Sequence, residues 1–469
     1  MKIFFIGICG TATGNAAILM KRLGHEVGGS DTGMYEPMKS ALKDADISAQ
    51  EGWNPEQLDA FSPDLVVVGN AISRMNPELE FVLASQKYEY TSLSELIGKE
   101  IIGKRKSLVV SGTHGKTTTT CLAAFLLREN GIDAGWLIGG IPTDLPEGGS
   151  NLGKNSAPFV IEGDEYDTAF FDKRSKFLHY RPRVLLINNI EFDHADIFRD
   201  LTDVKRTFTH VRRIVSPLGL IVENGDDQNI ASLEATPWVR RMTVGTSDSC
   251  DVKILDFHQK PDSSSFTIEF KGKRKSVEWN LPGIYNARNA AMAIVGAAEI
   301  LGKEPLDIDI SSLSKFRGVK RRQEIILDTP NLKAIEDFGH HPTALKLTIE
   351  SLRQKYPDYK LVACFEPRSN TAKTNIFQNQ FAASLSEADA AYVGAVNANK
   401  IEPSRRMDTK ALAEYNPKKI KAFNSNAELL EALSKDIDAS QKTLCVFFSN
   451  GSFDNIHKEF AKRFCKIIP

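Results

Sequence analysis

The residues with the clearest chemistry lie in a loop rich in glycine and threonine, from Ser111 to Thr120. An apolar run precedes this loop, and a segment typical of a helix follows it, from Cys121 to Leu127. A strand, a glycine turn and a helix in this order direct backbone N–H groups and the positive end of the helix at an anion. Lys116 would contact the outer phosphates of a nucleotide, and the hydroxyl of Thr117 would bind Mg²⁺. We therefore predict that this loop binds a nucleoside triphosphate.

The spacing of the glycines departs from the common phosphate-binding pattern, G-x-x-x-x-G-K-[ST]. The position of the first glycine in that pattern is Val110 here, and the first glycine of the loop is Gly112. The loop is therefore tighter than the common form. Gly-Lys-Thr also occurs by chance in many chains, but the preceding strand, the following helix and the run of threonines favour a nucleotide site.

Length and composition indicate an ordinary globular protein of several domains. The 469 residues suggest about three domains. Apolar residues make up 42% of the chain and charged residues 25%, and the net charge of −1 gives no reason to expect nucleic acid as a partner. No apolar run approaches the ~20 residues of a membrane span, and the first residues look like a strand rather than a signal peptide. Six scattered cysteines without a C-x-x-C pattern predict free thiols. We expect a cytoplasmic protein that does not bind membranes.

Short apolar runs recur along the chain, and helix-like segments separate most of them. This pattern predicts an α/β fold with buried parallel strands. The runs are Lys2–Gly7, Leu65–Asn70, Leu108–Gly112, Phe159–Glu162, Val184–Asn189, Leu361–Glu366, Ala391–Gly394 and Leu444–Ser449. Polar groups at the carboxyl ends of such strands are where open α/β sheets bind ligands.

Composition also suggests where the domains end. Gly103–Lys106 reads as a linker, and the charged stretch Lys315–Arg322 marks a second boundary. We therefore expect domains at residues 1–105, 106–318 and 319–469. Within the second domain, residues 219 to 282 resemble a β-rich insert, with hairpins expected at Glu223–Asp226 and at Lys271–Lys273.

A second glycine turn, from Gly7 to Gly14, follows the first expected strand, and a helix-like run continues to Leu23. Asp31 lies about 20 residues beyond these glycines, a position that suits a ribose hydroxyl. Asn70, at the end of another strand, could line the same crevice. The spacing G-x-x-G-x-x-x-G differs from the dinucleotide pattern. The turn alone is compatible with a nucleotide, a nucleotide-linked sugar or a purely structural role.

Two clusters of acids follow apolar strands, at Glu162–Asp167 and Glu191–Asp196. Such clusters often form solvated loops, but parallel strands would place both on the rim that carries the phosphate loop. Mg²⁺ that bridges phosphates prefers oxygen ligands, which makes Glu162 and Thr117 candidates. His194 could hold a second ion or orient a substrate. Near the C-terminus Arg368 follows a strand and could pair with a carboxylate or lie on the surface.

Together, and in this order, these motifs resemble those of the Mur ligase family, and the resemblance covers nearly the whole chain. The segments that carry it are Gly7–Thr11, Gly112–Thr119, Asp164–Phe177, Glu191–Phe198, His340–Thr343 and Glu366–Thr371. Phe171–Phe177 and Glu366–Thr371 favour the peptide-recycling branch of the family over the L-alanine-adding branch. The resemblance implies a Rossmann-like UDP-binding domain, a central P-loop domain with a mostly parallel sheet, and a C-terminal Rossmann-like domain.

The resemblance implies an ATP-dependent and Mg²⁺-dependent ligase. It would join the tripeptide L-Ala-γ-D-Glu-meso-diaminopimelate to UDP-N-acetylmuramate in the recycling of cell-wall peptide. The muramate carboxylate would take the γ-phosphate of ATP to form an acyl phosphate, and the amine of the peptide would then expel phosphate. Phosphorylation supplies the leaving group that a carboxylate lacks, so catalysis rests on positioning and on neutralising charge.

The resemblance also implies roles for individual residues. UDP-sugar contacts would come from Gly10, Thr11, Asp31 and Asn70. ATP contacts would come from Gly112, Thr113, His114, Gly115, Lys116, Thr117, Thr118, Asn286, Asn289, Arg322, Asp337 and His340. Catalytic or metal-binding roles would fall to Lys116, Thr117, Glu162 and His194. Arg368 and Asn370 would recognise the peptide, with Arg368 expected to bind a diaminopimelate carboxylate.

Two positions depart from the family pattern. Tyr285 stands where relatives commonly have histidine, and Phe208 and Thr209 stand where several relatives carry a carbamylated lysine. We therefore expect no carbamate, and we expect the nearby Lys205 to lie on a helix surface.

Three other functions stay open: UDP-N-acetylmuramate–L-alanine ligase, a non-ligating P-loop ATPase, and a regulator that binds UDP-sugars. The sequence leaves the oligomeric state open as a monomer or weak dimer.

Overall fold

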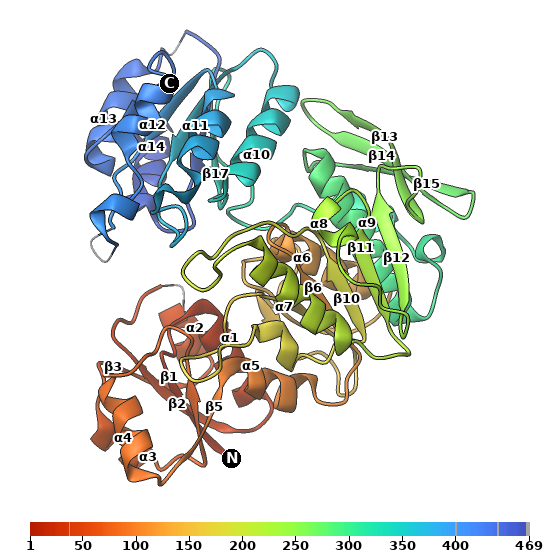
Figure 1. Cartoon of the computed structure of the whole chain (residues 1–469), viewed down its shortest axis with the longest axis vertical. Helices are drawn as coiled ribbons and strands as arrows, with labels where there is room; N and C mark the ends of the chain where they lie inside the picture. The colour runs from red at the N-terminus through yellow and green to blue at the C-terminus, as the bar shows by residue number, and fades with distance from the viewer. Residues whose placement is uncertain (37, 399–400, 439, 466–469) are drawn as a thin grey trace.

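The computed structural model describes residues 1–36, 38–398, 401–438 and 440–465. Within these residues the chain forms three sheets in succession (Figure 1). We call the segments that carry these sheets the first, second and third parts of the chain.

The first part is a parallel sheet of five strands in the order β3-β2-β1-β4-β5. Its strands are β1 (Lys2–Ile6), β2 (Glu26–Asp31), β3 (Ser48–Glu51), β4 (Leu65–Val68) and β5 (Glu89–Ser92). Its helices are α1 (Thr11–Arg22), α2 (Met38–Asp44), α3 (Pro55–Phe61), α4 (Pro77–Ser85) and α5 (Leu93–Leu96), and a π-helix covers Ile97–Ile102. Because the strand order reverses between β1 and β4, the loops after these two strands border one crevice.

The second part is a sheet of ten strands in the order β15-β14-β13-β12-β11-β10-β6-β9-β7-β8. Its strands are β6 (Ser107–Ser111), β7 (Gly135–Leu137), β8 (Ser150–Asn151), β9 (Phe159–Gly163), β10 (Val184–Ile187), β11 (Leu220–Asn224), β12 (Arg240–Gly245), β13 (Val252–Gln259), β14 (Ser264–Phe270) and β15 (Lys273–Trp279). Its α-helices are α6 (Lys116–Glu129), α7 (Leu201–Arg213), α8 (Gln228–Ala231) and α9 (Ile284–Leu301), and short 3₁₀ helices cover Lys176–His179, Pro305–Asp307 and Ser311–Lys315. Antiparallel pairing is confined to β7–β8 and to β13–β15.

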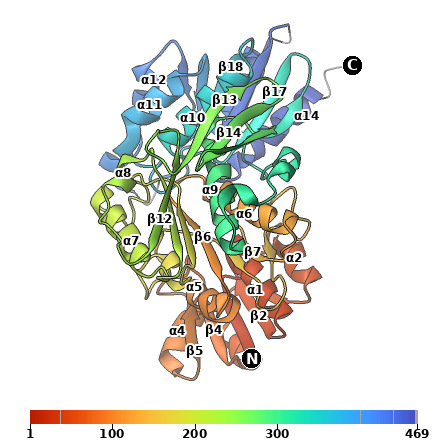
Figure 2. The same cartoon turned by 90° about the vertical axis from the view of Figure 1, so that its right-hand side faces the viewer.

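Alternating side chains of β6 divide the core of the second part between the two faces of the sheet. Leu108 and Val110 pack in one cluster with α6 and α9, which lie side by side in Figure 2. Val109 packs in the opposite cluster with α7, and this cluster also contains β1 and α1 of the first part. The first and second parts therefore share a hydrophobic core.

The third part is a sheet of six strands in the order β16-β17-β21-β18-β19-β20. Its strands are β16 (Glu324–Asp328), β17 (Leu332–Asp337), β18 (Lys360–Phe365), β19 (Ala390–Val393), β20 (Ile420–Ala422) and β21 (Thr443–Phe448). Its helices are α10 (Pro342–Lys355), α11 (Gln378–Ser386), α12 (Thr409–Tyr415), α13 (Asn426–Asp436) and α14 (Ile456–Cys465). Only the edge strand β16 pairs antiparallel among the described strands of this sheet.

The predicted α/β class is confirmed. Each of the eight apolar runs forms a strand with bounds shifted by at most a few residues, and these strands pair in parallel with their neighbours in the sheets. The predicted helix from Cys121 to Leu127 lies within α6. The helix predicted to continue to Leu23 is α1, whose C-terminus is followed by Gly24 with a left-handed φ of 88°.

The region from residue 219 to 282 is β-rich, as predicted, because it forms β11 to β15, but it is not a separate insert, and the hairpin predicted at Glu223–Asp226 is wrong. β11 pairs in parallel with β10 and with β12, so this region extends the main sheet. Asn224 ends β11 and donates a hydrogen bond of 2.8 Å to the Asn188 carbonyl. Asp227 then caps α8 by accepting hydrogen bonds from two backbone N–H groups of that helix. The Asn-Gly pair therefore starts a crossover instead of a hairpin.

The second predicted hairpin is confirmed, because β14 and β15 pair antiparallel from Phe270 and Lys273 onward. Lys271 and Gly272 both have positive φ, at 49° and 78°. This is the combination that a tight two-residue turn requires.

All six cysteines are free thiols, and five of them are buried, which confirms their expected role in the core. No helix in the described part of the chain has both the length and the apolar character needed to cross a bilayer.

Candidate functional site

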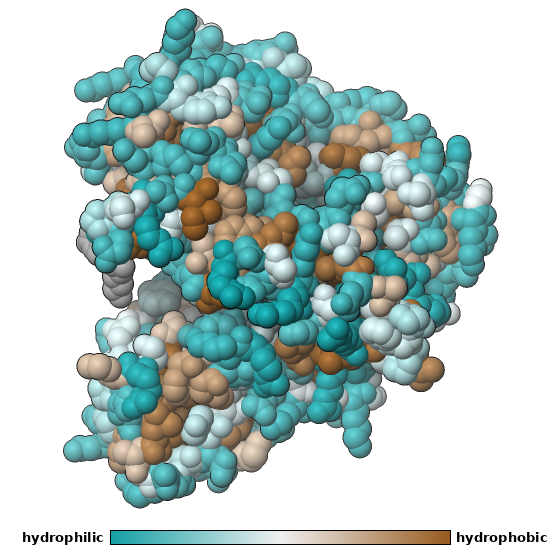
Figure 3. Space-filling model, in the orientation of Figure 1, coloured by the Kyte–Doolittle hydropathy of each residue, from teal (hydrophilic) through white to brown (hydrophobic). Residues whose placement is uncertain are grey.

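A cavity of about 1150 Å³ lies where the three parts of the chain meet, and Figure 3 shows a hollow on the surface between the first and third parts. Most of the predicted site residues line this cavity, although they come from segments far apart in the sequence. These residues are Gly10, Thr11, Asp31, Asn70, Thr113, His114, Gly115, Lys116, Thr117, Thr118, Glu162, His194, Asn286, Asn289, Arg322, Asp337 and His340. Gly112, Arg368 and Asn370 are not among its lining residues. The roles given to all these residues stay predictions.

The glycine loop joins β6 to α6 and has the geometry that an anion needs. Gly112 and Gly115 have φ of 129° and 80°, in the region that favours glycine. A Cβ atom at Gly115 would lie 2.7 Å from Oδ1 of Asn289, so the close packing of the loop on α9 also requires glycine. Gly115 has no side chain to cap α6. The first N–H groups of this helix therefore point at the cavity without a side-chain partner.

Lys116 extends from the start of α6 into a group of carboxylates. Its Nζ lies 2.8 Å from Oε2 of Glu165 and 3.8 Å from Oδ1 of Asp164. Burial alone would lower the pKa of Lys116, but these carboxylates outweigh it and hold the pKa above its usual value. Lys116 therefore stays protonated and places a positive charge beside the glycine loop.

His194 shares the same acids from the opposite side. Its Nε2 lies 3.5 Å from Oε1 of Glu165, and burial, which would lower the pKa, is outweighed by Glu165, so that the pKa of His194 rises to about 9. Asp164, Glu165 and His194 present ligand atoms that all lie within 4.8 Å of one another. Lys176 also reaches this group, with Nζ 2.6 Å from Oδ2 of Asp164. Glu165 and Lys176 were not among the predicted site residues.

Thr117 and Glu162 offer oxygen ligands for a magnesium ion. Oγ1 of Thr117 lies 3.2 Å from Oε2 of Glu162, and the Gly139 N–H donates to Oε1 of the same carboxylate at 2.6 Å. Burial raises the pKa of Glu162 above its usual value, and a bound cation would favour its charged form. The two oxygens are spaced closely enough to be adjacent ligands of one octahedral Mg²⁺.

Two asparagines on the first turns of α9 flank the other side of the glycine loop. Asn286 donates to the Pro282 carbonyl at 2.7 Å, and Asn289 donates to Oδ1 of Asn286 at 3.2 Å. Tyr285, which precedes Asn286, hydrogen-bonds with Gln323, and burial raises the pKa of its hydroxyl. The Tyr285 side chain is therefore tied to the segment that leads into the third sheet.

The third part contributes Arg322, Asp337 and His340 to the cavity. Nη2 of Arg322 donates to Oγ1 of Thr117 at 3.2 Å. Asp337 ends β17 and accepts hydrogen bonds from the N–H groups of Gly339 at 2.7 Å and Gln323 at 3.0 Å. Burial lowers the pKa of His340, which keeps this ring neutral near neutral pH.

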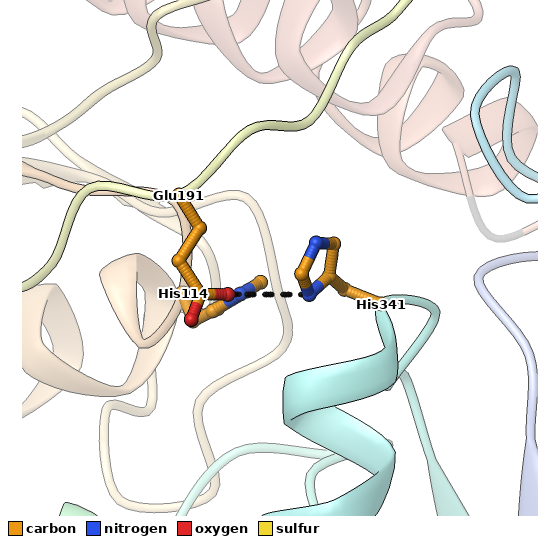
Figure 4. A group of neighbouring side chains, drawn as sticks. All are labelled: His114, Glu191 and His341. Carbon is orange, nitrogen blue, oxygen red and sulfur yellow. Dashed lines mark hydrogen bonds and ion pairs between the residues drawn. The ribbon is translucent and has the colours of Figure 1, made fainter. Parts of the chain in front are cut away.

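A contact that the sequence did not predict joins His114 of the glycine loop, Glu191 of the loop after β10, and His341 (Figure 4). Oε2 of Glu191 lies 2.8 Å from Nε2 of His114 and 3.3 Å from Nδ1 of His341. Burial lowers the pKa of His341 to about 4. The signal available in the sequence was the His-His-Pro-Thr run, in which His341 caps α10 by accepting from the Thr343 N–H.

The predicted peptide-binding residues lie at the edge of this arrangement. Nη1 of Arg368 is 3.5 Å from Oε1 of Glu366, and 46% of the Arg368 side chain is exposed. Nδ2 of Asn370 donates to Oδ2 of Asp196 at 2.7 Å, which links the loop after β18 to the loop after β10. Asn370 therefore lies at the contact between the second and third parts, and Arg368 lies free enough to meet a ligand.

The predicted UDP-sugar residues lie at the carboxyl end of the first sheet. Oδ2 of Asp31 accepts a hydrogen bond of 2.9 Å from the Cys9 N–H, which fixes the glycine turn against β2. Nδ2 of Asn70 donates to the Asp167 carbonyl at 2.7 Å. This second contact joins the first part to the acid-rich loop of the second.

Comparison with known domain families matches three consecutive segments of the chain. Residues 2–104 match the family described as Mur ligase family, catalytic domain; residues 110–297 match the Mur ligase middle domain; residues 321–451 match the Mur ligase, glutamate ligase domain. The chain belongs to the Mur ligase family. The family resemblance in the sequence is thereby confirmed, and this Mur ligase carries all three of the family's domains.

Individual relatives cover almost the full length of this Mur ligase. A UDP-N-acetylmuramate–L-alanyl-γ-D-glutamyl-meso-2,6-diaminoheptandioate ligase from Haemophilus influenzae is 36% identical over 97% of this chain and 98% of its own. A UDP-N-acetylmuramate–L-alanine ligase from Lactobacillus acidophilus is 30% identical over 98% of each chain. The crystal structure of a murein peptide ligase from Psychrobacter arcticus aligns over 100% of both chains, with a TM-score of 0.73 and 33% identity.

The structure also places Phe208 and Lys205, the residues that bear on the expectation of no carbamate. Phe208 is completely buried on α7 and packs against Phe177, with ring centroids 5.6 Å apart. Lys205 lies one turn earlier on the same helix and is partly exposed. Phe208 is thus part of the hydrophobic core of this Mur ligase.

Proposed function

We propose that this Mur ligase joins the tripeptide L-Ala-γ-D-Glu-meso-diaminopimelate to UDP-N-acetylmuramate, with conversion of ATP to ADP and phosphate. The observation that carries the proposal is the single cavity in which the glycine loop, the crevice of the first sheet and the third part meet. A ligase of this kind must hold ATP next to the carboxylate that it activates and next to the amine that attacks the activated carboxylate. All three parts of the chain contribute binding groups to this cavity. The names of the Haemophilus influenzae and Psychrobacter arcticus relatives support the choice of acceptor.

The reaction follows from the side chains around the glycine loop. The muramate carboxylate attacks the γ-phosphorus of ATP, ADP leaves, and an acyl phosphate forms. The peptide amine then attacks the acyl carbon, loses a proton and expels phosphate. Lys116 and the N–H groups at the start of α6 hold the phosphates, and they neutralise charge where it develops. Thr117 and Glu162 would hold Mg²⁺, which shields the phosphate oxygens from the incoming carboxylate.

The remaining predicted roles belong to the same proposal. Asn286, Asn289, Arg322, Asp337 and His340 would contact the adenosine and phosphates of ATP, and His194 would hold a second metal ion. The UDP moiety would lie against Gly10, Thr11, Asp31 and Asn70 in the crevice of the first sheet. Arg368 and Asn370 would hold the peptide. We assign the three functional domains to residues 1–105, 106–318 and 319–469.

The third part is expected to close on the glycine loop when the substrates bind, because its groups complete a site built on the second part. Contacts that already connect these parts include the hydrogen bond from Arg322 to Thr117 at 3.2 Å and that from the Ala195 N–H to Oγ1 of Thr371 at 3.1 Å. X-ray scattering with and without ATP and UDP-N-acetylmuramate tests this expectation. Superimposable profiles would show that the parts do not move.

The choice of acceptor is tested with a panel of amines. The purified protein is given ATP, Mg²⁺ and UDP-N-acetylmuramate with the tripeptide, with L-alanine or with no amine, and ADP release is measured. We expect rapid release with the tripeptide alone. Strong turnover with L-alanine and none with the tripeptide would assign the protein to the L-alanine-adding reaction, which the Lactobacillus acidophilus relative is named for. Equal turnover without any amine would instead indicate a non-ligating ATPase.

A further inference from the structure

The side chains of His114, Glu191 and His341 meet in a way that the proposed reaction does not use. The backbone N–H of His114 donates to Oδ1 of Asn189 at 2.7 Å, whereas its imidazole faces Glu191 (Figure 4). The two imidazoles pack against each other with ring centroids 4.7 Å apart, and Oε2 of Glu191 contacts one nitrogen of each ring. One ligand atom from each of the three residues lies within 4.8 Å of the others, and all three residues line the cavity.

The hydrogen bonds of His341 show which of its ring nitrogens carries a proton. Nε2 lies 3.2 Å from the Phe192 carbonyl, which can only accept, so Nε2 is the donor. Nδ1 is therefore unprotonated, and its lone pair faces the N–H of Thr343 at 3.3 Å, a long hydrogen bond that a metal bound to this nitrogen would replace. The same Nδ1 lies 3.3 Å from the Glu191 carboxylate, so that two acceptors face each other. A cation between them would turn this unfavourable contact into a favourable one.

We propose that His114, Glu191 and His341 form a binding site for one zinc ion, with a fourth position open to the cavity. Two imidazole nitrogens and one carboxylate oxygen are a ligand set of zinc sites that keep an open position. Ligands at zinc bond lengths in a tetrahedron are separated by about 3.3 Å, close to the separations of 2.8 and 3.3 Å found around Glu191. Imidazole nitrogens make the site unsuitable for Mg²⁺, which prefers oxygen.

The hydrogen bonds that orient His341 and Glu191 are also typical of a metal site. The ring N–H of His341 opposite to Nδ1 is held by the Phe192 carbonyl, as is usual for a histidine that binds a metal. The second oxygen of Glu191 accepts the hydroxyl of Thr343 at 3.1 Å. Both contacts fix the orientation of the ligands before a metal arrives. Binding would release the proton that His114 otherwise shares with Glu191.

The site would connect two parts of the enzyme. His114 and Glu191 belong to the second part, whereas His341 caps α10 of the third. A zinc ion bound to all three would hold the third part against the glycine loop in the arrangement seen here. We therefore expect zinc to compact the protein in the absence of nucleotide, independently of which amine the enzyme ligates.

The experiment uses the full-length protein stripped of metal and free of nucleotide. Co²⁺ is titrated in as the probe, because tetrahedral Co²⁺ absorbs strongly in the visible range, and Zn²⁺ is then added as a competitor. We expect one equivalent of Co²⁺ to bind with tetrahedral absorbance and one equivalent of Zn²⁺ to displace it. X-ray scattering of the same samples is expected to show a smaller radius of gyration with Zn²⁺.

Three variants decide whether the ion lies at this site. His341→Asn keeps a residue that can cap α10 but removes the imidazole, and Glu191→Gln keeps the size of the side chain but removes its charge. Each is expected to weaken Co²⁺ binding by more than about tenfold, since even groups behind a metal ligand contribute that much. His210→Asn, at an exposed position on α7, is the matched control and is expected to bind as the wild type does.

The proposal is overturned if both His341→Asn and Glu191→Gln bind Co²⁺ as tightly as the wild type. It is also overturned if binding is lost in His194→Asn but kept in His341→Asn, because the ion would then lie at the cluster of Asp164, Glu165 and His194. If His341→Asn does not fold, as judged by circular dichroism, Glu191→Gln alone decides. None of these outcomes depends on turnover, so they are independent of the proposed ligase reaction.

Discussion

The guanidinium of Arg322 donates a hydrogen bond of 3.2 Å to the hydroxyl of Thr117, which joins the segment before the third sheet to the glycine loop. Burial lowers the pKa of Arg322, but arginine remains charged in proteins, so this contact brings a positive charge to the phosphate site. The same hydroxyl lies 3.2 Å from Glu162. The hydroxyl of Thr117 thus contacts both Glu162 of the proposed metal site and Arg322 of the third part.

Replacement of Arg322 tests this arrangement. Arg322→Ala removes a donor that acts on developing phosphate charge, and we expect kcat to fall by about 10²- to 10³-fold. Arg322→Lys keeps the charge but loses the fork geometry, so a smaller fall is expected. Steady-state ADP release is the measurement. Arg317→Ala, a nearby exposed arginine paired with Asp144, serves as control. A normal kcat in Arg322→Ala would exclude this residue from phosphate binding.

Lys116→Ala separates ATP chemistry from binding of the UDP-sugar. The variant loses the charge at the mouth of the glycine loop, and we expect no measurable turnover. Binding of UDP-N-acetylmuramate, measured by calorimetry, is expected to persist because its proposed contacts lie on the first sheet. Lys154→Ala, an exposed lysine, is the control for loss of a positive charge. Unchanged turnover in Lys116→Ala would contradict the assignment of the glycine loop.

Arg368→Ala tests the proposed peptide contact. Its side chain is 46% exposed and only loosely paired with Glu366, so its removal should leave the fold intact. We expect the KM for the tripeptide to rise by at least about tenfold, the worth of a charged hydrogen bond to a carboxylate. The KM values for ATP and UDP-N-acetylmuramate provide the internal control and are expected to stay the same. An equal rise in all three would indicate a structural effect instead.

The sequence predicted side chains that the structure brings to one cavity, because each of these segments has a local signal. Lys116, Thr117 and Glu162 follow apolar strands, and parallel strands bring their carboxyl ends to one edge of a sheet. The contact between Glu191 and His341 has no such signal. It depends on how the second and third parts pack, and neither hydrophobic period nor turn chemistry encodes that. The wrong hairpin at Glu223–Asp226 has another cause, since Asn-Gly serves a strand-to-helix turn as readily as a hairpin.

Asp172 provides a test of pH dependence away from the proposed metal sites. Its carboxylate accepts two hydrogen bonds from Arg174, at 2.8 and 2.7 Å, and contacts His179 at 3.0 Å. The bonds from Arg174 lower the pKa of Asp172 from 3.8 to about 2. A carboxyl whose pKa is lower in the folded state stabilises the fold fully above the unfolded pKa. This stabilisation is lost as the pH falls from about 4 toward 2.

Asp172→Asn removes this ionisation. We expect the free energy of unfolding in urea to be lower than that of the wild type by a constant amount between about pH 7 and 5. The difference should shrink as the pH falls below about 4. Asp248→Asn, at a fully exposed aspartate, is expected to show no comparable change. A difference of the same size at both ends of the range would mean that the ionised carboxylate is not the stabilising group.

Phe208 and Lys205 test the expectation that this Mur ligase carries no carbamylated lysine. The ring is completely buried against Phe177, so Phe208→Ala should destabilise the protein by about 3–5 kcal/mol, measured by urea unfolding. Phe208 does not line the cavity, so turnover per folded molecule is expected to stay close to that of the wild type.

Lys205→Ala should change neither stability nor turnover appreciably, because this side chain is partly exposed on α7. A large loss of turnover in Lys205→Ala would mean that this lysine takes part in the reaction.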